Sequence, residues 1–230
     1  LIGLFGIGQM PTGEKDPFAL RRHALGVLRM LIEKALPVSL NTLIDAAWEA
    51  EKAVPGVTDH REELRQFFQD RLRVMLRDAG YTTLEVDAVL ALNPEKLDEL
   101  PKRLAAVRAF MALPEAEALT AANKRIGNIL KKIEGEVPTV VNEALLAEDA
   151  EKQLFAAIND VEPKALQHFA AGEYEQMLAT LAVLRGPVDS FFDNVMVNAE
   201  DPALRATRQA LLKRLYDVMN KVAEIARLAK

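Results

Sequence analysis

The feature that most constrains this chain is a recurring Asp-Pro or Asn-Pro pair at the head of an apolar, helix-periodic stretch. The pairs are Asp16-Pro17, Asn93-Pro94 and Asp201-Pro202. Asp and Asn side chains accept hydrogen bonds from the free N–H groups that begin a helix, and proline suits the first helical position because its missing N–H is not needed there. We therefore expect a helix after each pair, the last one running to the C-terminus.

Apolar residues recur at helical spacing along the whole chain, and 50% of its residues are hydrophobic while 6% are aromatic. This pattern predicts an all-α protein. Asn93-Pro94 and Pro101 interrupt the pattern, so we place a domain boundary near residues 93–103. The expected architecture is a helical body over residues 1–100 followed by a helical bundle over residues 101–230.

Capping residues and proline or glycine breaks give the bounds of the individual helices. In the second expected helix, Leu43 and Trp48 should face the core of the protein. The apolar stretch Phe191 to Val197 should pack against the last helix as a plug that holds it in place. A break is expected near Glu162-Pro163, and Gly186-Pro187 should end the helix before it. The expected helices cover residues 17–35, 39–53, 59–79, 83–92, 101–113, 119–133, 145–171 (one or two), 174–184 and 202 onward.

Composition excludes several classes of site. The chain has no cysteine, so it can form neither disulfides nor thiolate metal sites. No apolar run approaches the roughly 20 residues that span a bilayer, so no membrane contact is expected. The chain starts within LIGLFGIG rather than at a methionine, which indicates a fragment of a longer polypeptide.

No catalytic or metal-binding constellation is visible. The glycine-rich stretch over residues 1–15 lacks both a Gly-Lys-Ser/Thr ending and a G-x-G-x-x-G frame after a strand, which favours a connecting loop over a phosphate site. His23, His60 and His168 lie in different elements, and none has a second histidine at ligand spacing. We expect each of them at the surface or at the boundary of the core.

Two groups of cations are candidates for contact with a phosphate backbone. The first is a row at helical spacing on the 59–79 helix, but acids are interspersed along it, which favours a solvated, ion-paired face over RNA contact. The row consists of Arg61, Arg65, Arg73 and Arg77, and the interspersed acids are Glu62, Glu63, Asp70 and Asp78.

The second group lies on the 119–133 helix, where no acid falls between Thr120 and Ile133. It consists of Lys124, Arg125, Lys131 and Lys132, and we weigh RNA contact slightly above an ordinary solvated face. Arg205 and Arg208 on the last helix are expected to be exposed and to add to it. The net charge of −5 is weak evidence against RNA binding, because charges are screened within about 8 Å at physiological salt.

Three strings, in this order, resemble one known family over essentially the whole chain. They are GLFGIGQMPTGEKDPFALRR, AANKRIGNILKK and DSFFDNVMVNAEDPALRATRQALLKRL. The last resembles the signature of the DALR-type anticodon-binding domain, and together they are similar to the C-terminal part of the beta subunit of bacterial heterotetrameric glycyl-tRNA synthetase. The resemblance implies a DALR-type helical bundle over residues 101–230.

The resemblance implies a division of labour between two subunits. The alpha subunit uses ATP and Mg²⁺ to form the adenylate and to transfer glycine to the tRNA, and the beta subunit binds the tRNA. The expected partners are therefore the anticodon stem-loop of a glycine tRNA and the alpha subunit in an alpha2beta2 heterotetramer, in the cytoplasm, with no DNA and no cofactor in this fragment. Two alternatives stay open: a scaffold that only docks the alpha subunit, and a degenerate HD-type phosphohydrolase. The second is disfavoured because the chain has no His-Asp dipeptide and Asp59-His60 is reversed.

Overall fold

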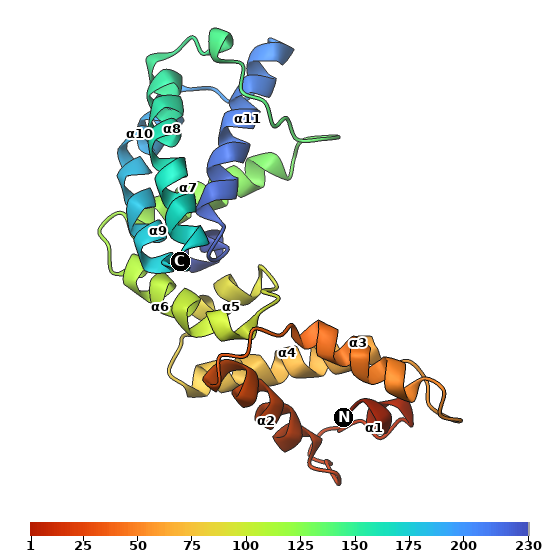
Figure 1. The fold of residues 1–230 in the computed structure, drawn as a ribbon. Helices are drawn as coiled ribbons and strands as arrows, with labels where there is room; N and C mark the ends of the chain where they lie inside the picture. Colours follow the sequence, from red (N-terminus) through yellow and green to blue (C-terminus); the bar gives the residue numbers. More distant parts are fainter. Residues whose placement is uncertain (230) are drawn as a thin grey trace. The chain divides into compact units, whose positions relative to one another are not determined.

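The computed structural model describes residues 1–229, which are predominantly helical (Figure 1). Pairing of β type is limited, over this range, to isolated bridges between Thr12 and Lys15 and between Ser39 and Lys96. The prediction of an all-α protein is thus confirmed. Contacts divide the chain into two compact units: Leu1–Asp87 with Asn93–Pro101, and Ala88–Leu92 with the chain from Lys102 onward. The chain passes from one unit to the other within α5 (Thr83–Leu90).

The first unit packs α2 and α3 against α4, with the short α1 against α3 and α4. Buried Leu28, Leu64 and Phe68 lie in its core, and the Phe5 and Phe67 rings pack with their centroids 5.3 Å apart. Its elements are α1 (Ile2–Gly6), α2 (Leu20–Glu33), α3 (Leu40–Glu51), α4 (Arg61–Asp78) and the 3-10 turn η1 (Leu97–Glu99).

In the second unit, α8 packs on α9, α10 and α11, and α7 packs on α10, α11 and the final turn η4. The fully buried Ile126, Ile158 and Leu211 show that α7, α8 and α11 share this core. Its elements are α6 (Leu100–Met111), α7 (Ala116–Leu130), η2 (Glu143–Leu145), α8 (Asp149–Ala170), α9 (Tyr174–Leu181), η3 (Ala182–Leu184), α10 (Arg185–Asn194), α11 (Pro202–Met219) and η4 (Ile225–Leu228).

The helix-start signals behave differently at the three sites. The Asp201 carboxylate accepts from the N–H groups of Ala203 and Leu204, at 2.7 and 3.3 Å, and Pro202 opens α11 as predicted. The Asp16 carboxylate also caps a helix, but it bonds the N–H groups of residues 20 and 21, so α2 begins three residues later than predicted. The prediction for Asn93 was wrong, because Asn93 adopts a positive φ of 46° and a turn follows instead of an α-helix.

Tertiary packing overrides two predicted breaks. Helix α8 continues through Pro163, since Val161 and Ala165 on either side are buried in the core of the second unit. Gly186 and Pro187 do not end a helix but occupy the first turn of α10, where a proline costs no hydrogen bond. The last predicted helix was too long, because α11 ends at Met219 and only a 3-10 turn follows.

Side-chain burial in α3 is weaker than predicted. Leu43 is 40% exposed and Trp48 is half-buried, with the Arg61 guanidinium 5.7 Å from the centre of its ring. Ile44 is the buried residue of this helix. Over the helices that the structure describes, none is both long and apolar enough to cross a membrane.

Candidate nucleic-acid interface

Helix α7 presents the basic group on its solvent side. Its apolar stripe, with Leu119, Ile126 and Leu130, is buried against the rest of the second unit. Because residues three or four apart share a face of a helix, the intervening positions are turned outward. Lys124 and Arg125 lie on that outer face, and Lys131 and Lys132 follow at the end of the helix, all four exposed.

None of these four cations forms an ion pair with any residue in the described part of the chain. The Arg125 guanidinium lies 4.2 Å from the centre of the Phe192 ring of α10, a cation–π contact that orients it without neutralising it. Lys131 and Lys132 lie at the C-terminal end of α7, where the helix dipole favours positive charge. Four uncompensated cations on one surface suit contact with an anionic backbone.

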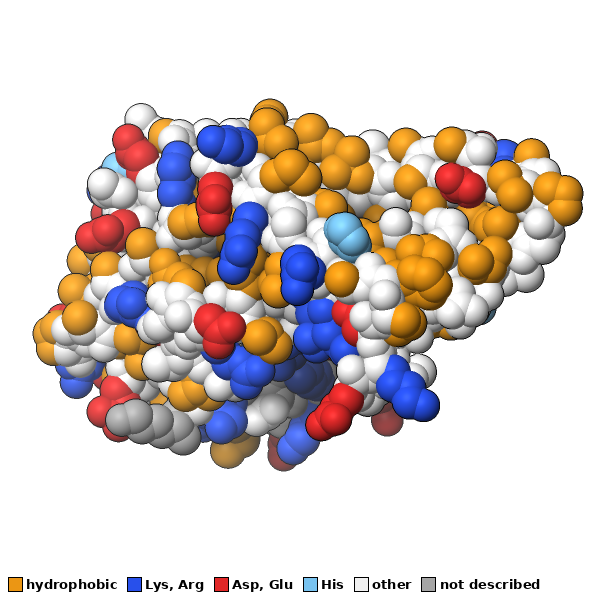
Figure 2. Space-filling model, turned by 90° about the horizontal axis from the view of Figure 1, so that it is seen from below, with side chains coloured by type: hydrophobic (Ala, Val, Ile, Leu, Met, Phe, Trp, Pro, Cys, Tyr) orange, Lys and Arg blue, Asp and Glu red, His pale blue; other side chains and the backbone are white. Residues whose placement is uncertain are grey.

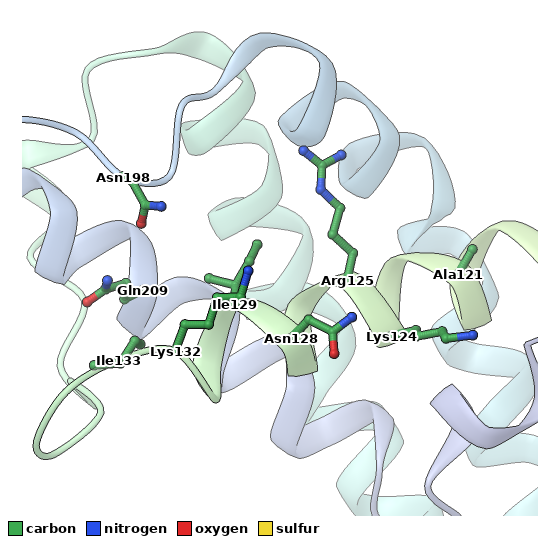
Figure 3. Close-up of a pocket in the computed structure, with 9 residues that line it drawn as sticks. All are labelled: Ala121, Lys124, Arg125, Asn128, Ile129, Lys132, Ile133, Asn198 and Gln209. Atoms are coloured by element: carbon green, nitrogen blue, oxygen red, sulfur yellow. The ribbon is translucent and has the colours of Figure 1, made fainter.

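A hollow of about 510 Å³ lies beside this row of cations. Figure 3 shows Asn198 and Gln209 on one side of it, and Ile129 of α7 with Lys132 just beyond the end of that helix on the other, while Arg125 points away toward α10. The remaining lining residues are Ala121, Lys124, Asn128 and Ile133. The hollow therefore combines an apolar floor, three carboxamides and several cations, drawn from α7, α11 and the segment between α10 and α11.

Close packing between α7 and α11 fixes the positions of these two helices, which line opposite sides of the hollow. A Cβ atom added at Gly127 would lie 3.2 Å from Cε2 of Tyr216, so glycine allows the two helices to approach here. Burial, with a contribution from Glu224, raises the pKa of Tyr216, which keeps its hydroxyl neutral. Asn123 is fully buried on the same face, with its amide nitrogen 3.9 Å from the sulfur of Met219.

The expectation that Arg208 is an exposed cation was wrong. Arg208 is 5% exposed and forms an internal ion pair with Glu151, which is 0% exposed. It also donates a hydrogen bond to the backbone oxygen of Met196 at 2.7 Å. The carboxylate of Glu151 lies 57 residues away in sequence, so no local pattern indicated this pairing. Arg208 is therefore not available to a ligand at the surface.

Arg205 has a related role one turn earlier in α11. It is half-buried and donates to the backbone oxygen of Ala199 at 2.9 Å. Hydrogen bonds from the side chains of Arg205 and Arg208 on α11 thus hold the backbone of the segment 195–200. Val195, Val197 and Ala199 are buried along it, whereas residues 196, 198 and 200 point outward.

The arginine row on α4 is largely neutralised within the first unit. Arg61 and Arg65 both bond the carboxylate of Asp45 on α3, at 2.8 and 2.6 Å, and Arg61 also bonds Asp59. The Arg61 side chain and N–H lower the pKa of the Asp59 carboxyl, and these carboxylates raise the pKa of Arg61. This agrees with the ion-paired interpretation, although Asp45 and Asp59 are the main partners rather than the acids expected.

Farther along α4 the pairing weakens. Arg73 lies 3.5 Å from Asp70 and 3.7 Å from Asp87, and Arg77 is exposed in the last turn. On the face drawn in Figure 2, blue Lys and Arg side chains lie among red carboxylates and orange apolar groups.

Sequence reasoning missed Asn198 and Gln209. Gln209 directly follows Arg208 but was not itself singled out, and Asn198 follows the apolar run 191–197, which was interpreted only as packing. Both lie at least 65 residues from Ile133 in the chain, and only the fold brings them to α7. The available sequence signal was the alternation of Val195, Val197 and Ala199 with residues 196, 198 and 200, which indicates that Asn198 points outward.

The histidines occupy half-buried or exposed positions. His60 and His168 contact Glu63 and Glu173, at 3.2 and 2.7 Å, and His23 is exposed on α2. Within residues 1–229, no three His, Asp or Glu side chains are placed so that they could hold a metal ion together.

Comparison with known proteins agrees with the resemblance. A family model described as glycyl-tRNA synthetase beta subunit matches residues 1–91, and one described as DALR anticodon binding domain matches residues 119–226. The chain is 62% identical over 229 residues to the glycine–tRNA ligase beta subunit of Leptothrix cholodnii. It is 56% identical to those of Thiobacillus denitrificans and Delftia acidovorans, over 230 and 229 residues.

Each of these matches covers 100% of this chain but only 32% of the relative, so the chain spans about a third of the length of these relatives. The two family models match separate stretches that correspond closely to the first unit and to most of the second. The chain therefore belongs to the glycyl-tRNA synthetase beta subunit family, and its residues 119–226 form a DALR anticodon binding domain.

Proposed function

We propose that residues 101–230 bind the anticodon stem-loop of a glycine tRNA, and that the α7 cations contact its phosphates. The observation that carries this proposal is the set of exposed, unpaired cations on α7, which lies within the matched DALR domain. Such cations release counterions from the RNA on binding, which favours association at low salt. The proposed contacts are Lys124, Arg125, Lys131 and Lys132. In the first unit, Arg77 is the exposed member of the α4 row and is a separate, secondary candidate.

The parent enzyme, in this proposal, is a cytoplasmic glycine–tRNA ligase in which the beta subunit holds tRNA and a separate alpha subunit carries the chemistry. ATP and Mg²⁺ would act on that alpha subunit, in an alpha2beta2 assembly. In this proposal the role of residues 101–230 is to hold the tRNA, and the steps of the reaction belong to the alpha subunit.

Footprinting of a glycine tRNA with this chain tests the proposal. We expect protection of the anticodon stem and loop, and no comparable protection when Lys131 and Lys132 are both changed to glutamate. Changing Lys102, an exposed lysine of α6, to glutamate serves as the matched control and should leave the protection in place. Protection confined to the acceptor stem, or none at all, would contradict an anticodon-binding role.

A second function has support in the first unit. There, the cations of α4 are mostly paired, but several large apolar side chains remain at the surface, among them Ile7, Phe18 and Met30, which are 45 to 55% exposed. Exposed apolar groups of this kind suit a protein contact better than an RNA contact. We propose that residues 1–100 contact the alpha subunit, and co-purification of the two chains with and without Met30→Glu and Phe18→Glu would test this.

A further inference from the structure

The hollow beside α7 differs from the row of cations in its chemistry. Phosphate contacts position a protein on RNA but carry no sequence information, whereas base edges are recognised by donors and acceptors in fixed places. Asn198 and Gln209 offer both donors and acceptors, and neither side chain is bonded to another group in the described part of the chain. Ile129 supplies an apolar surface in the same hollow, and Lys132 supplies a cation.

We propose that this hollow holds one unpaired nucleobase, with its edge read by Asn198 and Gln209, its face against Ile129 and its phosphate on Lys132. This inference rests on the proposed function and names the residues that would give it base selectivity. A single-stranded base stacks on apolar surface and exposes its hydrogen-bonding edge, so the chemistry needed is a flat apolar contact, carboxamides and a nearby cation. Figure 3 shows these four side chains around one opening.

The position of Asn198 is set by buried groups. The segment 195–200 alternates buried and exposed residues, so Asn198 points outward between Val197 and Ala199, which are 8 and 9% exposed. Arg208 and Arg205 bond the carbonyl oxygens on either side, at residues 196 and 199. Asn198 is thus held by its backbone neighbours while its side chain stays free for a ligand.

Arg208 is itself fixed from within the core. Its Nε bonds one carboxylate oxygen of Glu151, and the other oxygen of Glu151 accepts from the N–H groups of Ala147 and Glu148, each at 2.8 Å. This series of contacts links the start of α8 to the 195–200 segment. We assign Arg208 as a positioning residue: it supports the base-reading side chain and does not touch the RNA.

The test measures binding of the full chain to a glycine tRNA anticodon stem-loop and to a series of stem-loops, each abasic at one loop position. For the wild type, removing the read base should weaken binding by about 5- to 150-fold, the range for one bidentate base contact. For Asn198→Ala with Gln209→Ala, the intact stem-loop should bind more weakly, and removing that same base should cost much less. Lys132→Ala should instead lower the salt dependence and keep the preference for the intact base.

Gln167→Ala, which removes an exposed carboxamide from α8, is the matched control and should retain the wild-type pattern. Both altered positions of the double variant are at or near the surface and bond nothing, so its melting temperature should match that of the wild type. The wild type could bind the stem-loop while the double variant discriminates among the abasic stem-loops just as the wild type does. That result would show that the proposed base-reading site is wrong, but it would leave the proposal of anticodon binding intact. If the wild type protects no part of the stem-loop, both the site and the proposed function fall.

Discussion

The cations of α4 and those on and just after α7 each belong to one helical segment, but their surroundings differ. On α4, Arg61 and Arg65 share the carboxylate of Asp45, and Arg61 also bonds Asp59. On α7, Lys131 and Lys132 have no carboxylate partner among the residues described. The difference teaches that a row of cations is a candidate RNA contact only where its own fold leaves the charges uncompensated.

Arg208 is the extreme case of a compensated cation, and its removal should have the largest effect on stability. Arg208→Ala leaves the carboxylate of Glu151 buried without its cation, so the free energy of unfolding should fall by about 3 to 5 kcal/mol. Denaturant unfolding followed by circular dichroism measures this. Lys124→Ala, at an exposed position, should change stability by less than about 0.5 kcal/mol, and an equally small change for Arg208→Ala would contradict the internal role.

Charge reversal on α7 should have the largest effect on RNA binding. Lys131→Glu with Lys132→Glu removes two proposed phosphate contacts, so affinity for a glycine tRNA should fall about ten- to twentyfold near physiological salt. Fluorescence anisotropy with labelled tRNA measures the change, and thermal unfolding should show an unaltered midpoint because both side chains are exposed. Unaltered affinity would remove this end of α7 from the interface.

Asp45 provides a smaller test on the other side of the comparison. Asp45→Asn removes the shared partner of Arg61 and Arg65, and because all three side chains are partly exposed, stability should fall by no more than about 1 kcal/mol. If pairing is what keeps α4 from binding RNA, the variant should bind tRNA slightly more tightly than the wild type at low salt. A large loss of affinity would instead mean that the paired arginines already contact the RNA.

Asp59 should give the smallest effect, visible mainly through pH. The Arg61 side chain and N–H lower the pKa of Asp59 below its ordinary value of 3.8, so its contribution to stability is present above pH 3.8 and is lost as pH falls through the lowered pKa. Asp59→Asn should therefore be less stable than the wild type at neutral pH, and the difference should shrink on acidification below pH 3.8. Unfolding curves at several pH values check this, and a difference that grows in acid would contradict the assignment.

Local patterns predicted most of the helices but not where a buried core overrides them. The cap at Asp201 and the outer face of α7 followed from residues within one or two turns. Pro163 inside α8 and Gly186-Pro187 opening α10 depend on packing with other helices, which sequence spacing does not contain. Arg103 is similar, since its guanidinium bonds the carbonyl oxygens of residues 221 and 222, more than 100 residues away.

In the candidate site, too, some residues could be predicted from local sequence and others could not. The α7 cations were predictable because an acid-free stretch of one helix cannot pair its charges locally. Asn198 and Gln209 were not, because they join Ile129 and Lys132 only through the packing of α11 and the 195–200 segment against α7. The α4 row was predicted to be paired from nearby acids, yet Asp45, the partner that Arg61 and Arg65 share, comes from a different helix.

The most direct test of the central claim is the salt dependence of glycine tRNA binding, measured side by side for the wild type and two double variants. We predict that Lys131→Glu with Lys132→Glu makes the negative slope of log K against log salt shallower by about 1.4 to 1.8, which corresponds to two lost phosphate contacts, whereas Arg61→Ala with Arg65→Ala leaves the slope unchanged. Equal slopes for the wild type and the α7 variant, or a reduced slope for the α4 variant alone, would contradict the account.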